Sequence, residues 1–141
     1  MTRDETDVRA VCEAFGRAMQ AMDFGAMDGL WDRDYEHFLY QPEEFDRPCR
    51  NWVDFTSYLN YIPGVVKSVR WQDLEFDVAV LDDAAIVYAL VHLGFDLEGV
   101  EEPMEGDVRF TYGLRRTQGG WRLFHAHESR QLILDDAAAG N

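Results

Sequence analysis

Basic residues are scarce in this sequence. Its 13 lysines and arginines face 27 aspartates and glutamates, which leaves a formal net charge of −14 at pH 7. A surface with so large an excess of negative charge repels phosphate backbones and anionic lipid headgroups. We therefore expect no nucleic-acid partner and no membrane partner.

The sequence also lacks long apolar runs and has little cysteine. Its longest apolar runs, such as residues 84–93, fall far short of the roughly 20 residues that a membrane-spanning helix needs. The first five residues carry charges where a signal peptide would be apolar. The two cysteines, Cys12 and Cys49, have no metal-ligand spacing, and we expect no disulfide between them. These absences predict a cytoplasmic protein.

Several catalytic signatures are missing as well. The sequence has no Ser-His-Asp order, no Cys-His pair, no phosphate-binding glycine loop and no dinucleotide fingerprint. His125 and His127 alternate along one predicted strand as two metal ligands could, but no third ligand is marked by spacing. We expect no metal and no cofactor, which leaves proton transfer as the available chemistry.

Hydrophobic residues, in contrast, are plentiful. They make up 47% of the 141 residues, and 13% of the chain is aromatic. A chain of this length matches the commonest size of one domain, and no repeat or inner linker divides it. The sequence predicts a single domain over residues 1–141, with a core from about residue 5 to 132 and enough apolar surface to line a cavity.

The first half of the chain has helical periodicity. Thr2 and Glu5 form a capping box before apolar residues that recur every three or four positions, which predicts a helix. Asp23 is expected to cap a second, shorter helix, and Asn51 a third. Between these two helices, residues 37–40 have the character of a short strand.

The second half has the alternation of β-strands. Turn-forming residues separate four predicted antiparallel strands, near residues 65–81, 84–97, 107–117 and 121–132. In the first of them the apolar residues change phase near Gln72-Asp73, which predicts a β-bulge and a sharp bend of the sheet.

The predicted strand at 84–97 is apolar on both faces. One face carries Ile86, Tyr88 and Leu90, and the other carries Ala85, Val87, Ala89, Val91 and Leu93. Such a strand needs a cover on each side. We expect helices over the first face and a second copy of the chain over the second, which predicts a homodimer.

The order of these elements, closing on the hairpin at residues 114–129, resembles the SnoaL-like families of the nuclear transport factor 2-like superfamily. Its last hairpin, with Arg115-Arg116, Trp121, His125, His127 and Ser129, is also similar to the association domain of calcium/calmodulin-dependent kinase. The resemblance covers about residues 5–132. It implies an α+β fold: a cone-shaped, cystatin-like barrel in which three amino-terminal helices cover a strongly bent mixed β-sheet.

The resemblance further implies where a ligand pocket lies. Three arginines of the association-domain pocket correspond to Leu90, Thr111 and Glu128, so that domain's ligand is not expected here. Ketosteroid isomerase has a catalytic aspartate where this chain has Gln41, and an oxyanion tyrosine where it has Phe15, so we do not expect plain ketosteroid isomerase activity. The expected pocket residues are Tyr40, Gln41, Trp52, Tyr88, Leu90, Thr111 and Phe124.

Glu128 is the expected acid/base group of that pocket. Desolvation among apolar neighbours would raise its pKa into the range of general acid/base catalysis. A buried ion pair with Arg109 is the alternative and would lower that pKa. His92 and Arg109 are assigned to the same face, where they would bind or polarise a substrate oxygen.

Two kinds of function remain open. By resemblance to the polyketide-cyclase branch, the chain would be a cofactor-independent isomerase, cyclase or dehydratase acting on a hydrophobic carbonyl compound. Alternatively, it would be a non-catalytic ligand-binding or oligomeric assembly module. In either case the expected partners are a small hydrophobic molecule and a second copy of the chain.

Overall fold

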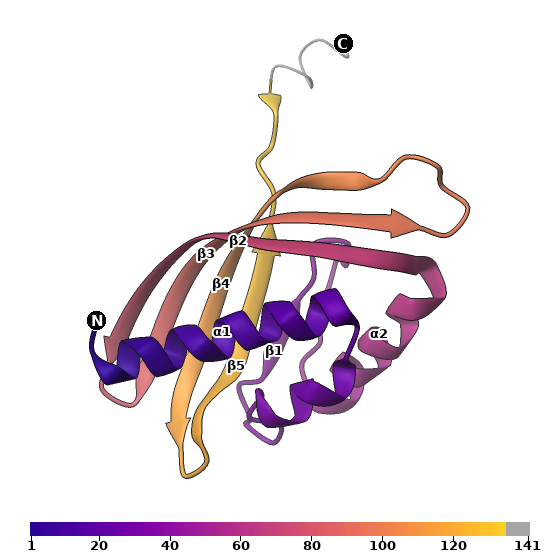
Figure 1. Cartoon of the computed structure of the whole chain (residues 1–141). Helices are drawn as coiled ribbons and strands as arrows, with labels where there is room; N and C mark the ends of the chain where they lie inside the picture. The colour runs from indigo at the N-terminus through magenta and orange to yellow at the C-terminus, as the bar shows by residue number, and fades with distance from the viewer. Residues whose placement is uncertain (135–141) are drawn as a thin grey trace.

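A single curled sheet forms the frame of the molecule. The computed structural model describes residues 1–134, and its five strands lie in the order β1-β5-β4-β3-β2. Helices pack on one face of this sheet, and α1 crosses its strands (Figure 1). The elements are α1 (Arg3–Ala21), η1 (Phe24–Gly29), β1 (Leu39–Gln41), α2 (Trp52–Val65), β2 (Val66–Leu81), β3 (Ala84–Leu97), β4 (Met104–Thr117) and β5 (Gly120–Ser129).

Helix α1 begins at the predicted capping box. The Thr2 hydroxyl accepts a hydrogen bond from the Glu5 amide at 3.1 Å, and the Glu5 carboxylate accepts one from the Thr2 amide at 3.4 Å. One stripe of the helix is buried against the sheet, and Gly16 lies in that stripe. A Cβ at this position would fall 2.3 Å from Nε1 of Trp71 on β2, so the close approach of helix and strand requires glycine here.

The next two helical segments differ from each other. Asn51 caps α2 as predicted, because its side-chain oxygen accepts a hydrogen bond from the Asp54 amide at 2.8 Å. The segment after Asp23 is a six-residue 3-10 helix, and the Asp23 side chain makes no capping hydrogen bond. The three helices of the prediction are therefore two α-helices and one short 3-10 helix. Among the described residues, no helix combines the length and the hydropathy that a membrane span requires.

Both parallel and antiparallel pairings occur in the sheet, as predicted. Strands β2 to β5 pair antiparallel in chain order, whereas the short β1 pairs parallel with β5. In that parallel pair Tyr40 lies opposite Ala126. This register brings the segment that follows the first helices beside the last strand of the chain.

Two of the three register shifts in the sheet lie within long strand pairings and change which residues face inward; the third lies at the start of β2, between Val66 and Ser68. The register of β2 shifts between Asp73 and Glu75, next to the predicted bulge. The second shift lies in β5, because Gly113 pairs with His125 while Leu114 pairs with Leu123. The extra residue in β5, Phe124, reverses the alternation of that strand.

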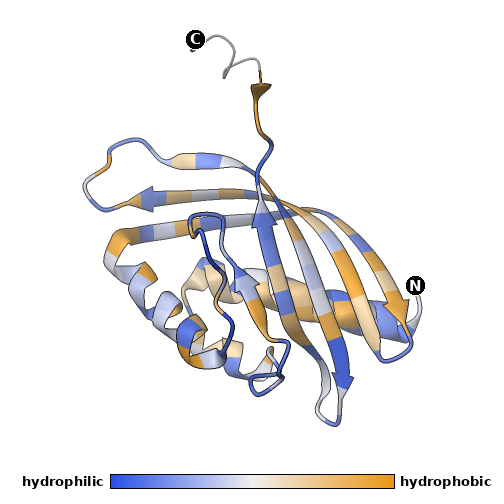
Figure 2. Cartoon of the chain, turned by 180° about the vertical axis from the view of Figure 1, so that it is seen from behind, coloured by the Kyte–Doolittle hydropathy of each residue, from blue (hydrophilic) through white to orange (hydrophobic). Residues whose placement is uncertain are grey.

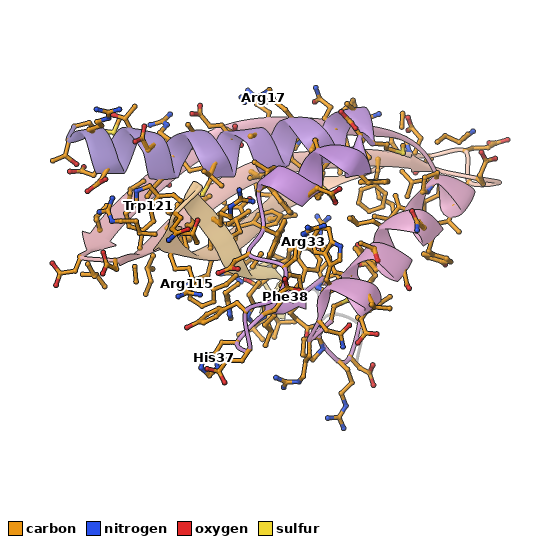
Figure 3. The ribbon with its side chains drawn as sticks, turned by 90° about the horizontal axis from the view of Figure 1, so that it is seen from below. Arg17, Arg33, His37, Phe38, Arg115 and Trp121 are labelled. Carbon is orange, nitrogen blue, oxygen red and sulfur yellow. The ribbon has the colours of Figure 1, made fainter. Side chains whose placement is uncertain are left out.

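Before that second bulge the odd-numbered residues of β5 face α1, and after it the even-numbered ones do. Trp121 lies on the α1 side (Figure 3), where its indole N–H donates to Asp4 at 3.3 Å. Beyond the bulge Ala126 and Glu128 are buried, while His127 is exposed. Glu128 therefore points into the body of the molecule.

The structure reverses the predicted faces of β3. Its core face carries Ala85, Val87, Ala89, Val91 and Leu93, which are all buried. The opposite face, seen without helices over it in Figure 2, carries Ile86, 53% exposed, and Tyr88, 38% exposed. Since both sets are apolar, alternation alone could not say which set α1 covers. The prediction that Ala85 to Leu93 form a subunit interface is wrong.

Candidate functional site

A small cavity lies where the ends of several elements converge. Its volume is about 70 Å³, and its walls come from the end of α1, the loop after β1, α2, the start of β2, the end of β3 and β5. These elements approach one another on the right-hand side of Figure 1. The lining residues are Met19, Glu43, Glu44, Tyr58, Ile62, Val66, Val69, Trp71, Leu93, Phe95 and Glu128.

Glu128 is the buried carboxylic acid of this cavity. Its residue surface is only 7% exposed, because the bulge at Phe124 turns it to the core side of β5. Tyr40 pairs with Ala126 in the parallel register and so lies one diagonal step from Glu128 on the same face. The strand pairing thus sets the distance between the phenol and the carboxyl group.

Two hydrogen bonds hold the Glu128 carboxyl group. The Tyr40 hydroxyl donates to Oε1 at 2.6 Å, and the Glu43 amide donates to Oε2 at 2.9 Å. The tyrosine is fully buried, so its hydroxyl depends on this partner. Among the described residues Glu128 has no ion pair, and the alternative of a buried pair with Arg109 does not form.

Burial dominates the ionisation of this group. Desolvation raises the pKa of Glu128 from 4.5 to about 8, although the hydrogen bonds from Tyr40 and the Glu43 amide both act to lower it. Burial likewise raises the pKa of Tyr40 well above its ordinary value, and the adjacent Glu128 raises it further. The protonated form of Glu128 is therefore favoured at neutral pH.

The loop after β1 closes over Glu128. The Gln41 side-chain amide donates to the carbonyls of Pro42 at 2.9 Å and Phe45 at 2.7 Å, which fixes the turn. Nε of Arg130 lies 2.7 Å from Oε1 of Glu43, an ion pair that ties the loop to the segment after β5. The amide of Glu43 is thereby held in place to donate to Glu128.

Another carboxylate of the loop lies at the cavity. The Tyr58 hydroxyl, from α2, is within 3.2 and 3.3 Å of the two oxygens of Glu44. Tyr58 is buried and Glu44 is exposed, so the pair extends from the interior of the cavity to its opening. Burial, with Glu128 and Glu44 nearby, raises the pKa of the Tyr58 hydroxyl, which stays a neutral donor.

The structure separates Glu128 from the two residues that were expected to act with it. The side chains of His92 and Arg109 lie on the outer face of the sheet. There His92 pairs with Asp107 at 2.9 Å, and a guanidinium N–H of Arg109 donates to the carbonyl of Arg130 at 2.7 Å. The shared face assigned to Glu128, His92 and Arg109 is thus incorrect, because the alternation of β3 and β4 is opposite to the one inferred from the resemblance.

Five of the expected pocket residues also lie elsewhere. Tyr88 and Thr111 are cross-strand neighbours on the exposed outer face, and Leu90 lies two residues further along β3 on that face. Trp52 packs against Phe55 beside Phe38, and Phe124 packs edge-on against Tyr35 at 5.2 Å between ring centres. None of these five lines the cavity. The two other expected residues contact its wall, because Tyr40 donates a hydrogen bond to Glu128 and Gln41 fixes the turn of the loop that contains Glu43 and Glu44.

Most of the actual lining was missed by the sequence interpretation. Tyr58 and Ile62 lie four residues apart on one face of α2, a spacing that indicates burial but does not show that a cavity lies against it. Trp71 comes just before the phase change in β2, and the strand register, which the sequence does not give, places it opposite Leu93 of β3. No signal in the sequence pointed to Glu43 and Glu44, because their position depends on the fold of a loop.

The described residues offer no cluster of three or more histidines, cysteines or acids arranged to hold a metal ion. The groups that the cavity presents to a ligand are three carboxyl groups, the Tyr58 phenol and apolar and aromatic walls. These groups can exchange a proton with a bound molecule and donate hydrogen bonds to its oxygen.

The curled sheet and the helices packed on one of its faces define a cone-shaped α+β fold of the cystatin-like, nuclear transport factor 2-like class. The sequence profile of the SnoaL-like domain matches residues 8–133, and the chain belongs to that family. A search of curated protein sequences finds no significant match.

Solved structures of the same class superpose on most of the chain. A Streptomyces avermitilis protein proposed to be a dehydratase of the nuclear transport factor 2-like family is 21% identical with a TM-score of 0.80, covering 92% of this chain and 97% of that one. A superfamily protein from Salmonella enterica is 12% identical with a TM-score of 0.81, covering 92% of each chain. A proposed calcium/calmodulin-dependent kinase type II association domain from Thiobacillus denitrificans is 21% identical with a TM-score of 0.71, covering 88% and 94%. At these identities the likeness establishes the fold.

Proposed function

We propose that this SnoaL-like domain binds a small hydrophobic carbonyl compound in the cavity and catalyses a cofactor-independent proton transfer on it. The observation that carries the proposal is the buried Glu128, whose pKa is raised to about 8 and whose carboxyl group lines the cavity. A group with a pKa near the working pH is suited both to give and to take a proton.

The two protonation states of Glu128 have separate roles. The carboxylate takes a proton from the carbon next to the substrate carbonyl, which leaves an enolate; the acid then returns that proton to another atom of the substrate. An isomerisation moves the proton between two carbons, and in a dehydration the acid protonates the leaving hydroxyl, which departs as water. The Tyr40 hydroxyl at 2.6 Å keeps the carboxyl group in one orientation throughout.

A relative supports this class of reaction. The Streptomyces avermitilis protein of the same fold is proposed to be a dehydratase, and dehydration is one of the reactions that a lone acid/base group can perform. The apolar walls from Ile62, Val66, Val69 and Leu93 exclude water from the reacting atoms.

Exchange of carbon-bound hydrogen tests the proposal without knowledge of the substrate. 4-Methylpentan-2-one is incubated with the protein in deuterated buffer, and deuterium uptake beside its carbonyl is followed by NMR. We expect acceleration by the native protein and a loss of at least about 100-fold in Glu128→Gln, a typical share for a general base. The swap keeps the shape and mimics the protonated acid, so the fold should remain intact.

Glu75→Gln is the matched control, since Glu75 is exposed on β2 and does not line the cavity. It should exchange deuterium at the native rate. Equal exchange rates for the native protein and Glu128→Gln, with both folded, would contradict the assignment of Glu128.

The second candidate is an assembly role, in which the chain forms a homodimer through the outer face of the sheet. The specific observation in its favour is the exposure of Ile86 and Tyr88 on the outer side of β3, with Leu90 in the same row. Apolar side chains gathered on an uncovered sheet are typical of protein interfaces. The Thiobacillus denitrificans relative is itself proposed to be an association domain. Assembly and catalysis use opposite faces of the sheet, so the two roles are compatible.

A further inference from the structure

All the charged residues of the cavity lining are acidic. Three of its eleven residues are glutamates, Glu43, Glu44 and Glu128, and no lysine, arginine or histidine is among them. The rest are apolar or aromatic. A ligand that enters this cavity therefore meets acidic groups without a neighbouring cation in the wall to offset them.

The three acids are not equivalent. Glu128 is mostly protonated near neutral pH, because burial raises its pKa to about 8. Glu43 is neutralised by Arg130, whose Nε lies 2.7 Å from its Oε1. Glu44 has the Tyr58 hydroxyl for a partner, and no salt bridge to it forms within residues 1–134. Glu44 is thus the carboxylate at the cavity whose negative charge is left for a ligand.

Aromatic side chains line the cavity together with Glu44. Tyr58, Trp71 and Phe95 line the same cavity as Glu44. The face of an aromatic ring attracts a cation, most strongly for tryptophan. Aromatic walls beside an uncompensated carboxylate form the environment in which proteins recognise ammonium groups.

We propose that the ligand of this cavity carries a protonated amine next to a short apolar group, and that Glu44 selects it by charge. The ammonium group lies at the mouth between Glu44 and the aromatic rings. The apolar group lies deeper, among Ile62, Val66 and Leu93, with its far end toward Glu128. Carboxylates and phosphates are rejected, since they would approach Glu44 without a counter-ion.

The size of the cavity limits the apolar part. A closed apolar cavity of roughly 150 Å³ takes up benzene. With about 70 Å³ available here, a branched chain of a few carbons fits, whereas a fused ring system would have to remain largely outside. This inference names the ligand class of the site proposed above and rests on that site being the functional one.

Three molecules with the same branched carbon frame test the charge preference. They are 3-methylbutylamine, 3-methylbutan-1-ol and 3-methylbutanoate, which are positive, neutral and negative at pH 7. Calorimetry gives each dissociation constant, and NMR shifts of the Trp71 indole proton report whether the cavity is occupied. We expect the amine to bind at least about tenfold more tightly than the alcohol, and the carboxylate more weakly than either.

Two variants separate recognition by Glu44 from attraction to a negatively charged protein. Glu44→Gln should raise the dissociation constant of the amine by about five- to tenfold and leave that of the alcohol unchanged. Glu75→Gln removes the same charge from an exposed site outside the cavity and should leave all three dissociation constants unchanged. Equal losses in the two variants would overturn the proposal, as would binding of the carboxylate at least as tight as that of the amine, or no binding of the amine.

The result is independent of the catalytic test. If the amine preference holds while Glu128→Gln leaves deuterium exchange unchanged, the ligand class stands and the proposed reaction fails. If exchange depends on Glu128 while the three ligands bind alike, the reaction stands and the role of Glu44 is refuted.

Discussion

Opposing effects meet at the carboxyl group of Glu128. Hydrogen bonds from Tyr40 and from the Glu43 amide favour the charged form, whereas desolvation favours the neutral one. Desolvation wins, because the side chain lies in an apolar cavity with no cation within contact distance among the described residues. The balance leaves an acid that changes its charge near neutral pH.

The raised pKa of Glu128 predicts a pH-dependent loss of stability. The unfolded chain releases this proton near pH 4.5 and the folded chain near pH 8, so native stability relative to Glu128→Gln is complete below about pH 4.5 and falls as the pH rises through 8. The difference across this window is on the order of 4 kcal/mol. Urea unfolding of both proteins at pH 5, 7 and 9 measures it, and parallel curves for the two proteins would show that Glu128 ionises normally.

The helices and strands were largely predictable, whereas the faces of the strands were not. Repeating apolar residues, the capping box at Thr2 and turn-forming residues predicted the main elements, and β3 has the predicted bounds of 84–97. The prediction of the inward face of β3 was wrong because both faces of this strand are apolar. The resemblance predicted that Glu128 faces a pocket. Its contact with Tyr40 could not be predicted, because that contact depends on a parallel pairing between distant segments that local patterns cannot specify.

Helix α1 and strand β2 approach each other most closely at Gly16. In Gly16→Ala the new methyl group would overlap the indole of Trp71, which is itself packed by Phe15 and Phe110. We expect a loss of about 1–3 kcal/mol from overpacking, although alanine is the better helix former. Thermal or urea unfolding measures the change.

Gly64→Ala is the control for that substitution. Gly64 lies in α2 with open space around the position of a Cβ, so alanine there should be neutral or stabilising by up to about 1 kcal/mol. Similar effects at the two positions would show that helix propensity, not the contact with Trp71, decides the result.

At the scale of the whole molecule, the outer face of the sheet is the interface of the proposed homodimer. Ile86 is 53% exposed on that face, so Ile86→Arg would place a charge in the proposed dimer interface. We expect a dimer of the native chain at micromolar concentration and a folded monomer of the variant, measured by light scattering. Val53→Arg, at an exposed position of α2, should remain dimeric. A monomeric native chain would exclude this interface.

The parallel pairing of β1 with β5 joins residues that are 88 positions apart in the chain, since Tyr40 and Glu128 meet only across it. During synthesis the amino-terminal helices and β1 leave the ribosome long before β5. Until β5 arrives, Tyr40 has no carboxyl partner, and β4 is an open edge that can pair with another chain. The contact between Tyr40 and Glu128 therefore forms only once β5 has joined the sheet, and a chain that ends before β5 lacks the proposed acid/base group altogether.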